Sequence, residues 1–528
     1  MRASAAIVMA ISLLVGAAHG AAHGAAHGAA HGAAHGAAHE AAHEAAHEAA
    51  HGAANDATGD ILWPTFAGNP SRDGNSGVAF PSGKLGLLWA SPTPDVIYKY
   101  QKGQTGSSPC LISTGGKHLL IAGSYDRNVY AYDAFTGQEQ WRFTTGDSVA
   151  ATPCYALVDG EPMLFAASSD RTVYALNPLS GKQRDSRNRQ MWTHRFYPWA
   201  ETVAPAFVGD PAVVVHDGRS LLLLTVWIND RKSQGNVQQS TLYAFDAPTG
   251  QIAWKTPIGP GTASAPAVGK VKETPAVFVV HDAGSVNAFS LSDGKPLWPK
   301  PFISQDAIRS GVSYAEIDGR RLLFFGSRLF SAFCIDADTA EMVWELRVGT
   351  WVDSTPAVFH RPGERTLVIL GDYQQVVHAV DALSGQGAWQ YRSYGYFSAS
   401  PVLIEFGGTA AAVMPCLDNH LYVVRADDGS FLFRAYTGEF LWSHYQRGAT
   451  VFPSAAAARL GGRSVLAVAS YDGRVHVFGE NGQDANVGPP RTRIVDALGG
   501  RIFAYVFGSI IVAALVYNGI RIARRSRK

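Results

Sequence analysis

The residues best suited to bind metal ions lie near the start of the 528-residue sequence, where a histidine recurs at every fourth position. On a helix, such imidazoles would form a stripe in which two neighbours share one ion. Alanine and three glutamates favour a helix there, whereas a glycine in each of six tetrads opposes it by about 1 kcal/mol relative to alanine. We therefore interpret the segment either as a low-complexity tether or as an arm that binds zinc, copper or nickel loosely at several sites. The histidines are His19, His23, His27, His31, His35, His39, His43, His47 and His51.

A second set of residues combines aromatic rings with a few charges in segments that join strands. This combination suits either a peptide partner or a flat ligand, although each residue taken singly is ordinary for loop packing. The sequence has no nucleophile elbow, phosphate loop, paired zinc motif or haem-attachment motif, which favours binding over catalysis. The candidate ligand or partner face comprises Trp199, Glu201, Arg309, Trp351, Asp353, Tyr396, Trp442 and His444.

Two of the four cysteines, Cys110 and Cys154, directly follow a proline in equivalent small-residue strands. Equivalent positions on neighbouring innermost strands make a disulfide between two blades conceivable in an oxidising compartment. The alternative is a pair of buried thiols. Cys334 and Cys416 lie in different strand types, and we expect both to remain free.

A repeat of 44 to 46 residues must position all of these loop residues. Its clearest copy is SYDRNVYAYDAFTGQEQW at residues 124–141, in which a strand, an Asp-to-Gly turn and a second strand with a tryptophan follow one another. A small-residue strand and a continuous apolar run precede each copy, and such runs are typical of strands buried on both faces. Four strands in forty-odd residues are typical of one propeller blade.

Counting these strands predicts an all-β, eight-bladed β-propeller with W-motif repeats. Three strand types occur eight times, but the fourth type is missing after the last copy, which ends with RVHVF at residues 474–478. The segment LGLLWASPT around Trp89 supplies it from the other end of the chain. We expect this strand to close the ring and the tryptophans to pack between neighbouring blades.

Composition supports a large, turn-rich globular domain. The chain is 47% hydrophobic and 16% charged, with 55 glycines, and its net charge of +1 gives no electrostatic basis for binding nucleic acid.

Both ends of the sequence indicate a protein placed at a membrane. The apolar segment 3–18 after Met1 and Arg2 is typical of a secretory signal peptide. Residues 502–520 carry no charge and, at about 1.5 Å per residue, would span about 28 Å as a helix. The basic tail RIARRSRK places the C-terminus in the cytoplasm and the propeller in the periplasm or another extracytoplasmic space. The predicted division is 1–18 signal peptide, 19–60 low-complexity arm and linker, 61–482 propeller, 483–501 linker, 502–520 transmembrane helix and 521–528 cytoplasmic tail.

The tryptophan-terminated repeat, the entry WPTFAGN at residues 63–69 and the count of eight resemble the pyrroloquinoline-quinone (PQQ)-type propeller family. That family includes quinoprotein alcohol dehydrogenases and the propeller lipoprotein of the bacterial outer-membrane assembly machinery. The resemblance implies the fold over residues 61–482 but does not fix the activity. In the dehydrogenases the quinone lies between a tryptophan and a ring formed by two adjacent cysteines, with calcium beside it. This sequence has no adjacent cysteines.

These observations leave three functional hypotheses. The first is a membrane-tethered extracytoplasmic scaffold or envelope assembly factor that binds a protein or peptide through the candidate face. The second is a quinoprotein oxidoreductase that holds PQQ and calcium on the same face. The third, metal capture by the histidine arm, is compatible with either of them.

Overall fold

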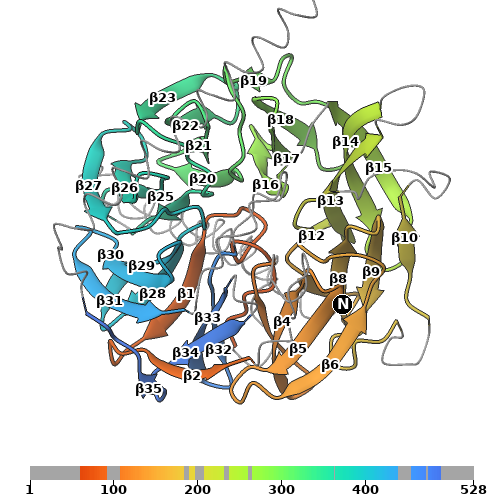
Figure 1. Cartoon of the computed structure of the whole chain (residues 1–528). Helices are drawn as coiled ribbons and strands as arrows, with labels where there is room; N and C mark the ends of the chain where they lie inside the picture. The colour runs from red at the N-terminus through yellow and green to blue at the C-terminus, as the bar shows by residue number, and fades with distance from the viewer. Residues whose placement is uncertain are drawn as a thin grey trace, which may run out of the picture. The chain divides into compact units, whose positions relative to one another are not determined.

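The chain adopts an eight-bladed propeller in the computed structural model, which describes residues 60–91, 107–183, 190–196, 207–230, 237–259, 264–361, 363–437, 453–470 and 474–488. Their strands form eight sheets arranged around a central axis (Figure 1). The predicted all-β, eight-bladed architecture is therefore confirmed. No helix long and apolar enough to cross a membrane occurs among the described residues, and the predicted span 502–520 lies outside them.

In the first four blades, antiparallel strands follow one another from the axis to the rim. In blade 3 the innermost position is shared by two short strands, β11 and β12, which both pair with β13. The bounds are, for blade 1, β3 Cys110–Thr114, β4 Lys117–Gly123, β5 Asn128–Asp133 and β6 Glu139–Thr144; for blade 2, β7 Cys154–Val158, β8 Glu161–Ser168, β9 Thr172–Leu176 and β10 Thr193–Arg195; for blade 3, β11 Phe207–Val208, β12 Ala212–His216, β13 Arg219–Asp230, β14 Val237–Asp246 and β15 Ile252–Gly259; and for blade 4, β16 Ala267–Val271, β17 Thr274–His281, β18 Ser285–Ser290 and β19 Phe302–Ile303.

The last four blades repeat this pattern, and blades 7 and 8 also receive strands from the chain's beginning. The bounds are, for blade 5, β20 Ser313–Ile317, β21 Arg320–Gly326, β22 Ser331–Asp336 and β23 Met342–Arg347; for blade 6, β24 Ala357–Phe359, β25 Leu367–Gly371, β26 Val376–Asp381 and β27 Gly387–Arg392; for blade 7, β28 Val402–Phe406, β29 Thr409–Cys416, β30 His420–Arg425 and β31 Phe431–Tyr436, with β1 Asn75–Phe80; and for blade 8, β32 Ala456–Leu460, β33 Arg463–Ala469 and β34 Val475–Gly479, with β2 Gly86–Ala90 and β35 Gln483–Asp484.

Tryptophans in or near the outermost strands join seven of the eight pairs of neighbouring blades, and Phe433 takes the tryptophan's place in blade 7. The indole N–H of Trp89 donates to Ala134 O (3.0 Å), and that of Trp141 donates to Pro178 O (2.8 Å). The same bond, at 2.8 to 3.0 Å, recurs at Trp192, Trp254, Trp298, Trp344 and Trp389. Each acceptor directly follows the residue that opens the neighbouring blade's turn. The repeat therefore encodes the joint between blades as well as the strands.

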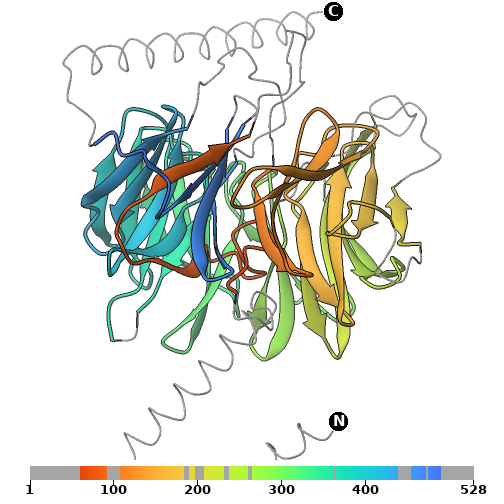
Figure 2. The ribbon, with the colours of Figure 1, turned by 90° about the horizontal axis from the view of Figure 1, so that it is seen from below.

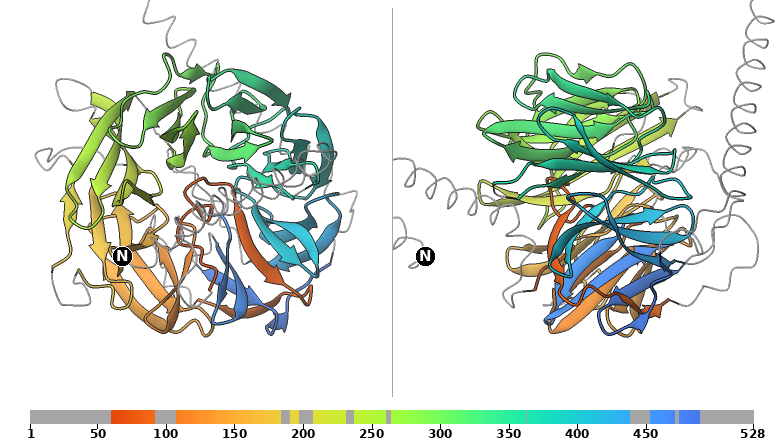
Figure 3. Two further views of the ribbon diagram at one scale, coloured as in Figure 1. Left: turned by 180° about the vertical axis from the view of Figure 1, so that it is seen from behind. Right: turned by 90° about the vertical axis from the view of Figure 1, so that its left-hand side faces the viewer.

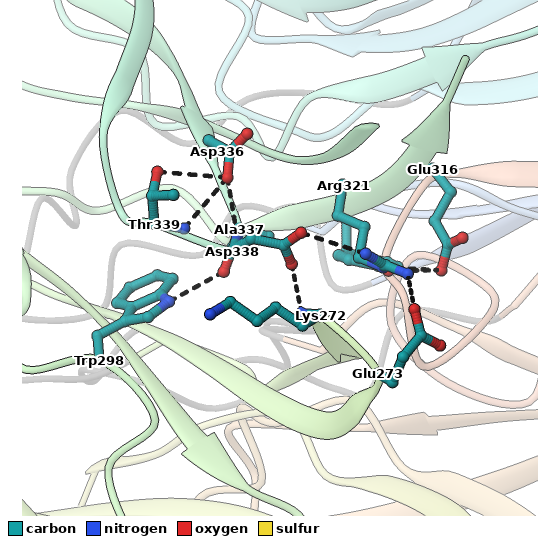
Figure 4. A network of polar contacts seen from close by, with 10 residues as sticks. Lys272, Glu273, Trp298, Glu316, Arg321, Asp336, Ala337, Asp338 and Thr339 are labelled. Atoms are coloured by element: carbon teal, nitrogen blue, oxygen red, sulfur yellow. Dashed lines mark hydrogen bonds and ion pairs between the residues drawn. The ribbon is translucent and has the colours of Figure 1, made fainter. Parts of the chain in front are cut away.

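One of these joints, between blades 4 and 5, also carries a cluster of charges (Figure 4). Trp298 Nε1 donates to Ala337 O (2.9 Å), and Arg321 lies among three carboxylates. Its guanidinium is 2.5 Å from Glu273, 3.2 Å from Asp338 and 4.0 Å from Glu316. Because Glu273 belongs to blade 4 and Arg321 to blade 5, this ion-pair network connects the two blades.

A belt of serine and threonine hydroxyls around the axis explains why the innermost strands begin with small residues. The Gly311 N–H donates to Thr355 Oγ1 (2.8 Å), and the Thr355 N–H donates to Ser400 Oγ (3.0 Å). The Ser400 N–H donates to Ser454 Oγ, and the Ser454 N–H donates to Ser108 Oγ, both at 2.9 Å. Each bond connects one blade to the next, from blade 5 to blade 1.

The ring closes as predicted, because β2 pairs antiparallel with β34 and supplies the fourth strand of blade 8 (Figure 2). Two further connections were not predicted. Strand β1 pairs in parallel with β28 of blade 7 and packs against β32 and β33 of blade 8. Beyond β35, the Val487 N–H donates to Arg434 O in β31 (2.8 Å). Blades 7 and 8 are thus connected to each other both near the axis and at the rim.

Residues 61–74, which we call the axial segment, contact every blade in order around the axis. Ile61 pairs with Arg459 of blade 8, and Trp63 pairs with Leu111 of blade 1. The segment's carbonyls then accept from Tyr155, Val268, Tyr314, Val358 and Leu403, which are the second residues of the innermost strands of blades 2, 4, 5, 6 and 7. Thr65 Oγ1 donates to Pro211 O of blade 3 (2.8 Å). Figure 3 shows the ring of blades from behind and from the side. The entry sequence WPTFAGN therefore belongs to the structural centre of the ring.

Arg72 holds the axial segment to blades 3 and 4. Its side chain is 1% exposed, and its guanidinium donates to Thr65 Oγ1 and to the carbonyls of Phe66, Pro266, Asp210 and Pro211. Burial lowers the pKa of Arg72, whereas the nearby negative charge of Asp210 raises it.

Asp210 is expected to make the stability of the ring depend on pH. Burial raises the pKa of its carboxyl, while the Thr152 N–H and the charge of Arg72 lower it. The folded state therefore holds this proton more tightly than the unfolded state does. The free energy of unfolding should fall as pH rises from the ordinary aspartate pKa through the raised one. The Asp210→Asn variant should lack this pH-dependent part of the free energy of unfolding. If urea titrations show that the free energy of unfolding changes equally with pH in the two proteins, the prediction is wrong.

Candidate functional site

The segments that carry the predicted face meet at one end of the axis, which we call the crossover mouth. It is formed by the connections from the outermost strand of one blade to the innermost strand of the next, together with the loops between second and third strands. Arg309, Asp353 and Ser398 each lie four residues before the innermost strand of blades 5, 6 and 7. The register expected from the sequence is therefore present at this mouth.

Asp353 is the centre of the best-defined polar cluster at this mouth. Its buried carboxylate accepts two bonds from Arg328, at 3.1 Å from Nε and 2.7 Å from Nη2. The Tyr373 hydroxyl donates to Asp353 Oδ2 at 3.1 Å. Charge-assisted, bidentate hydrogen bonds hold both partners in a fixed geometry. Asp353 is therefore a rigid support for the side chains around it.

Three aromatic rings lie beside the Asp353–Arg328 pair and extend across blades 5 to 7. Arg328 lies over the Trp351 ring at 4.4 Å, and Trp351 meets Tyr373 edge to face at 5.6 Å. Tyr373 stacks on Tyr396 at 5.8 Å with an angle of 21°. All three rings are partly exposed. We call Trp351, Tyr373 and Tyr396 the aromatic row.

The structure therefore brings together three of the eight predicted residues. Trp351 and Asp353 share one cluster, and Tyr396 joins it through Tyr373. Arg309 lies at the same mouth, and among the described residues its Nε has no hydrogen-bond partner. Trp199, Glu201, Trp442 and His444 lie outside the described residues.

Sequence reasoning missed Arg328 and Tyr373, which complete the cluster. Both belong to loops between second and third strands, whereas the residues predicted from the sequence lie in the crossovers between blades. The signal was available, because each residue lies two positions after the end of an apolar second strand and the antiparallel order puts that end at the crossover mouth.

The other loops of this mouth contain a recurring Asp–Tyr pair with a structural role. The Tyr174 hydroxyl donates to Asp170 (2.6 Å), and Asp126 accepts from Tyr130 (2.5 Å) in the same way. Burial, followed by the hydrogen bond to Asp170, raises the pKa of Tyr174 to about 12. Asp170 also accepts from the Gly146 N–H of the preceding crossover. These hydrogen bonds therefore hold the loops between second and third strands in one conformation.

The disulfide considered between Cys110 and Cys154 is not formed; both residues are free and buried. The Cys110 thiol donates to Pro64 O in the axial segment (3.4 Å). Burial raises the pKa of the Cys154 thiol to about 11, so it stays protonated at neutral pH. Cys334 and Cys416 are also free, as expected.

The described residues offer little to a metal ion or a quinone at this mouth. No three metal-ligating side chains converge among them, and the histidine arm lies outside them. Both oxygens of Asp353 are already hydrogen-bonded, and Arg328 lies against the Trp351 ring. A quinone and calcium at this cluster would have to displace Arg328, so the cluster as built does not fit them.

Comparison with known proteins identifies related sequences. A family model described as outer membrane protein assembly factor BamB matches residues 52–226, 238–308, 283–404 and 334–497. A curated relative, outer membrane protein assembly factor BamB of Burkholderia pseudomallei, is 27% identical over 202 residues, which are 37% of this chain and 46% of the relative. The chain thus matches less than half the length of that relative.

Solved structures with a similar fold include two quinohemoprotein alcohol dehydrogenases. The enzyme ADHIIG from Pseudomonas putida HK5 has a TM-score of 0.57 at 13% identity, covering 82% of each chain. The enzyme from Comamonas testosteroni has a TM-score of 0.57 at 14% identity, covering 84% of this chain and 83% of the other. At these identities the likeness concerns the fold alone.

Proposed function

Because the chain belongs to the PQQ-type propeller family described as outer membrane protein assembly factor BamB, we propose that it is an envelope scaffold that binds a protein or peptide partner at the crossover mouth. The name of the Burkholderia pseudomallei relative supports a role in envelope assembly. In this proposal a signal peptide exports the propeller, and the segment 502–520 tethers it to the membrane.

The observation that carries the proposal is the aromatic row held in place by the Arg328–Asp353 ion pair. Tyrosine, tryptophan and arginine are the residue types that contribute most to binding energy at protein interfaces. Here Arg328 and Asp353 hold Trp351 in place, so little conformational entropy remains to be lost on binding. Partly exposed rings from adjacent blades offer a continuous apolar contact with hydroxyl groups along it.

The proposal predicts that the double variant Trp351→Ala/Tyr396→Ala loses its partner. Photo-crosslinkers placed at the crossover mouth of the full-length protein would first identify the partner in the envelope. The purified partner should then bind the double variant at least about tenfold more weakly than the original protein, because two ring contacts are removed. Asp353 is left intact, since its loss would leave Arg328 without its carboxylate.

The matched control is Leu157→Ser/Val215→Ser at the opposite mouth. These side chains are 52% and 65% exposed, so the change also removes exposed apolar surface. The control should retain binding, and circular dichroism should show that both variants fold. If the two double variants bind equally well, the partner does not use the crossover mouth.

The two other hypotheses remain proposals. A quinoprotein activity would require a site other than the Asp353 cluster as it stands, or a rearrangement of Arg328. The fold likeness to the quinohemoprotein enzymes does not choose between activities. Binding of zinc, copper or nickel by the arm between His19 and His51 is independent of the scaffold role and can coexist with it.

A further inference from the structure

Phe330, at the crossover mouth of blade 5, has a backbone conformation that is unfavourable for its side chain. Its φ is 65°, and it is the only aromatic residue with positive φ among the described residues. Left-handed backbone is costly for side chains other than glycine, and a bulky aromatic residue there is a clear outlier. Such strain is found where surrounding structure enforces it, and often at functional sites.

The loop imposes this conformation, whichever residue occupies the position. The equivalent residues of the other described loops between second and third strands also have positive φ: Arg127 at 80°, Arg171 at 72°, Gly284 at 85°, Gln375 at 72° and Asn419 at 69°. The carbonyl of Phe330 accepts from the Val348 N–H (2.8 Å), as that of Arg127 accepts from the Thr145 N–H. The backbone geometry is thus shared, and the phenyl ring is peculiar to blade 5.

The fold leaves about half of the Phe330 side chain exposed. Phe330 is 49% exposed, and among the described residues it makes no aromatic ring contact. A polar residue or glycine would satisfy the loop equally well. The loop geometry therefore does not require the half-exposed phenyl ring.

The surroundings of Phe330 resemble the edge of an interface. Ser331 pairs across the sheet with Arg347, which is 84% exposed and lies 3.4 Å from Glu345. Arg328, two residues before Phe330, covers the Trp351 ring. Ile303, 61% exposed, ends the outermost strand of blade 4, whose crossover joins Arg328 through Ala307 O (2.9 Å).

We propose that Phe330 is the anchor through which a partner protein docks, and that the partner presents an apolar pocket with an acidic rim. The pocket receives the phenyl ring, and the rim faces Arg347. This inference rests on the proposed scaffold function and deepens it, because it assigns the principal contact to one residue beside the aromatic row.

The test compares Phe330→Gly with Arg127→Gly in the full-length protein, with the purified partner identified by crosslinking as probe. Glycine relieves the backbone strain, so both variants should melt about 1 to 2 °C higher than the original protein. Phe330→Gly should weaken binding about 30-fold or more, as expected for an anchor residue. Arg127→Gly, in blade 1, should bind as the original protein does.

Each other result contradicts a defined part of the inference. Binding within threefold of the original would show that the ring is not an anchor, whereas a lower melting temperature for Phe330→Gly would contradict the premise that the loop does not require the ring. If Phe330→Gly binds normally while Trp351→Ala/Tyr396→Ala abolishes binding, the scaffold function stands and only the anchor fails. If no envelope protein binds the original chain, both proposals fail. Arg347→Glu should slow association most at low salt; faster association would exclude the acidic rim.

Discussion

Replacing Gly250 with alanine should lower the free energy of unfolding by about 3 kcal/mol, because the added methyl group combines a steric clash with an unfavourable backbone conformation. Gly250 follows the turn of blade 3, where a Cβ atom would lie 2.3 Å from Trp192 Cδ2. The residue also has φ of 71°, which alanine tolerates poorly. Urea unfolding followed by tryptophan fluorescence would measure the loss.

Gly218 is a matched control within the same blade. Its φ is 72°, but nothing lies within 4 Å of the position that a Cβ would occupy. Gly218→Ala should therefore cost only about 1 kcal/mol, the backbone contribution alone. Equal losses for the two variants would show that the tryptophan contact does not constrain the turn.

Replacing Arg72 with methionine should cost about 3 to 5 kcal/mol, because it leaves buried acceptors and the nearby Asp210 without their cation. The guanidinium donates to one hydroxyl and four carbonyl oxygens, which belong to the axial segment and to blades 3 and 4. We expect a much lower urea midpoint and faster proteolysis of the axial segment.

Arg142→Met provides the comparison for Arg72→Met. Arg142 also makes a bidentate ion pair, at 2.7 Å to each oxygen of Glu139, but its side chain is 56% exposed. A solvent-exposed pair contributes less than about 1 kcal/mol. If Arg72→Met were as mild as Arg142→Met, the axial segment would not hold the ring together.

The sequence predicts the ring well because each blade repeats the same local information. The apolar run of β25 is buried throughout, as expected for a central strand, and the tryptophans lie between blades. Trp89 showed that the last blade takes its fourth strand from the N-terminus. These features depend on short-range patterns, which a repeat displays several times.

The axial segment and the aromatic row could not be predicted in the same way. The axial segment occurs once, so no repetition shows that its carbonyls accept hydrogen bonds from seven blades and that its Thr65 hydroxyl donates to the eighth. Likewise, Tyr373 and Trp351 are 22 positions apart, and only the arrangement of blades 5 and 6 brings their rings together. Contacts that depend on three-dimensional closure leave no local pattern.

The path of residues 61–74 also has a consequence for the order of folding. This segment is synthesised before any blade, yet its hydrogen bonds require all eight innermost strands, the last of which ends at Leu460. Contacts so distant in sequence are slow to form. The nascent chain can therefore complete the hydrogen bonds of residues 61–74 only after nearly the whole domain has emerged, and ring closure becomes the late, committing step of its maturation.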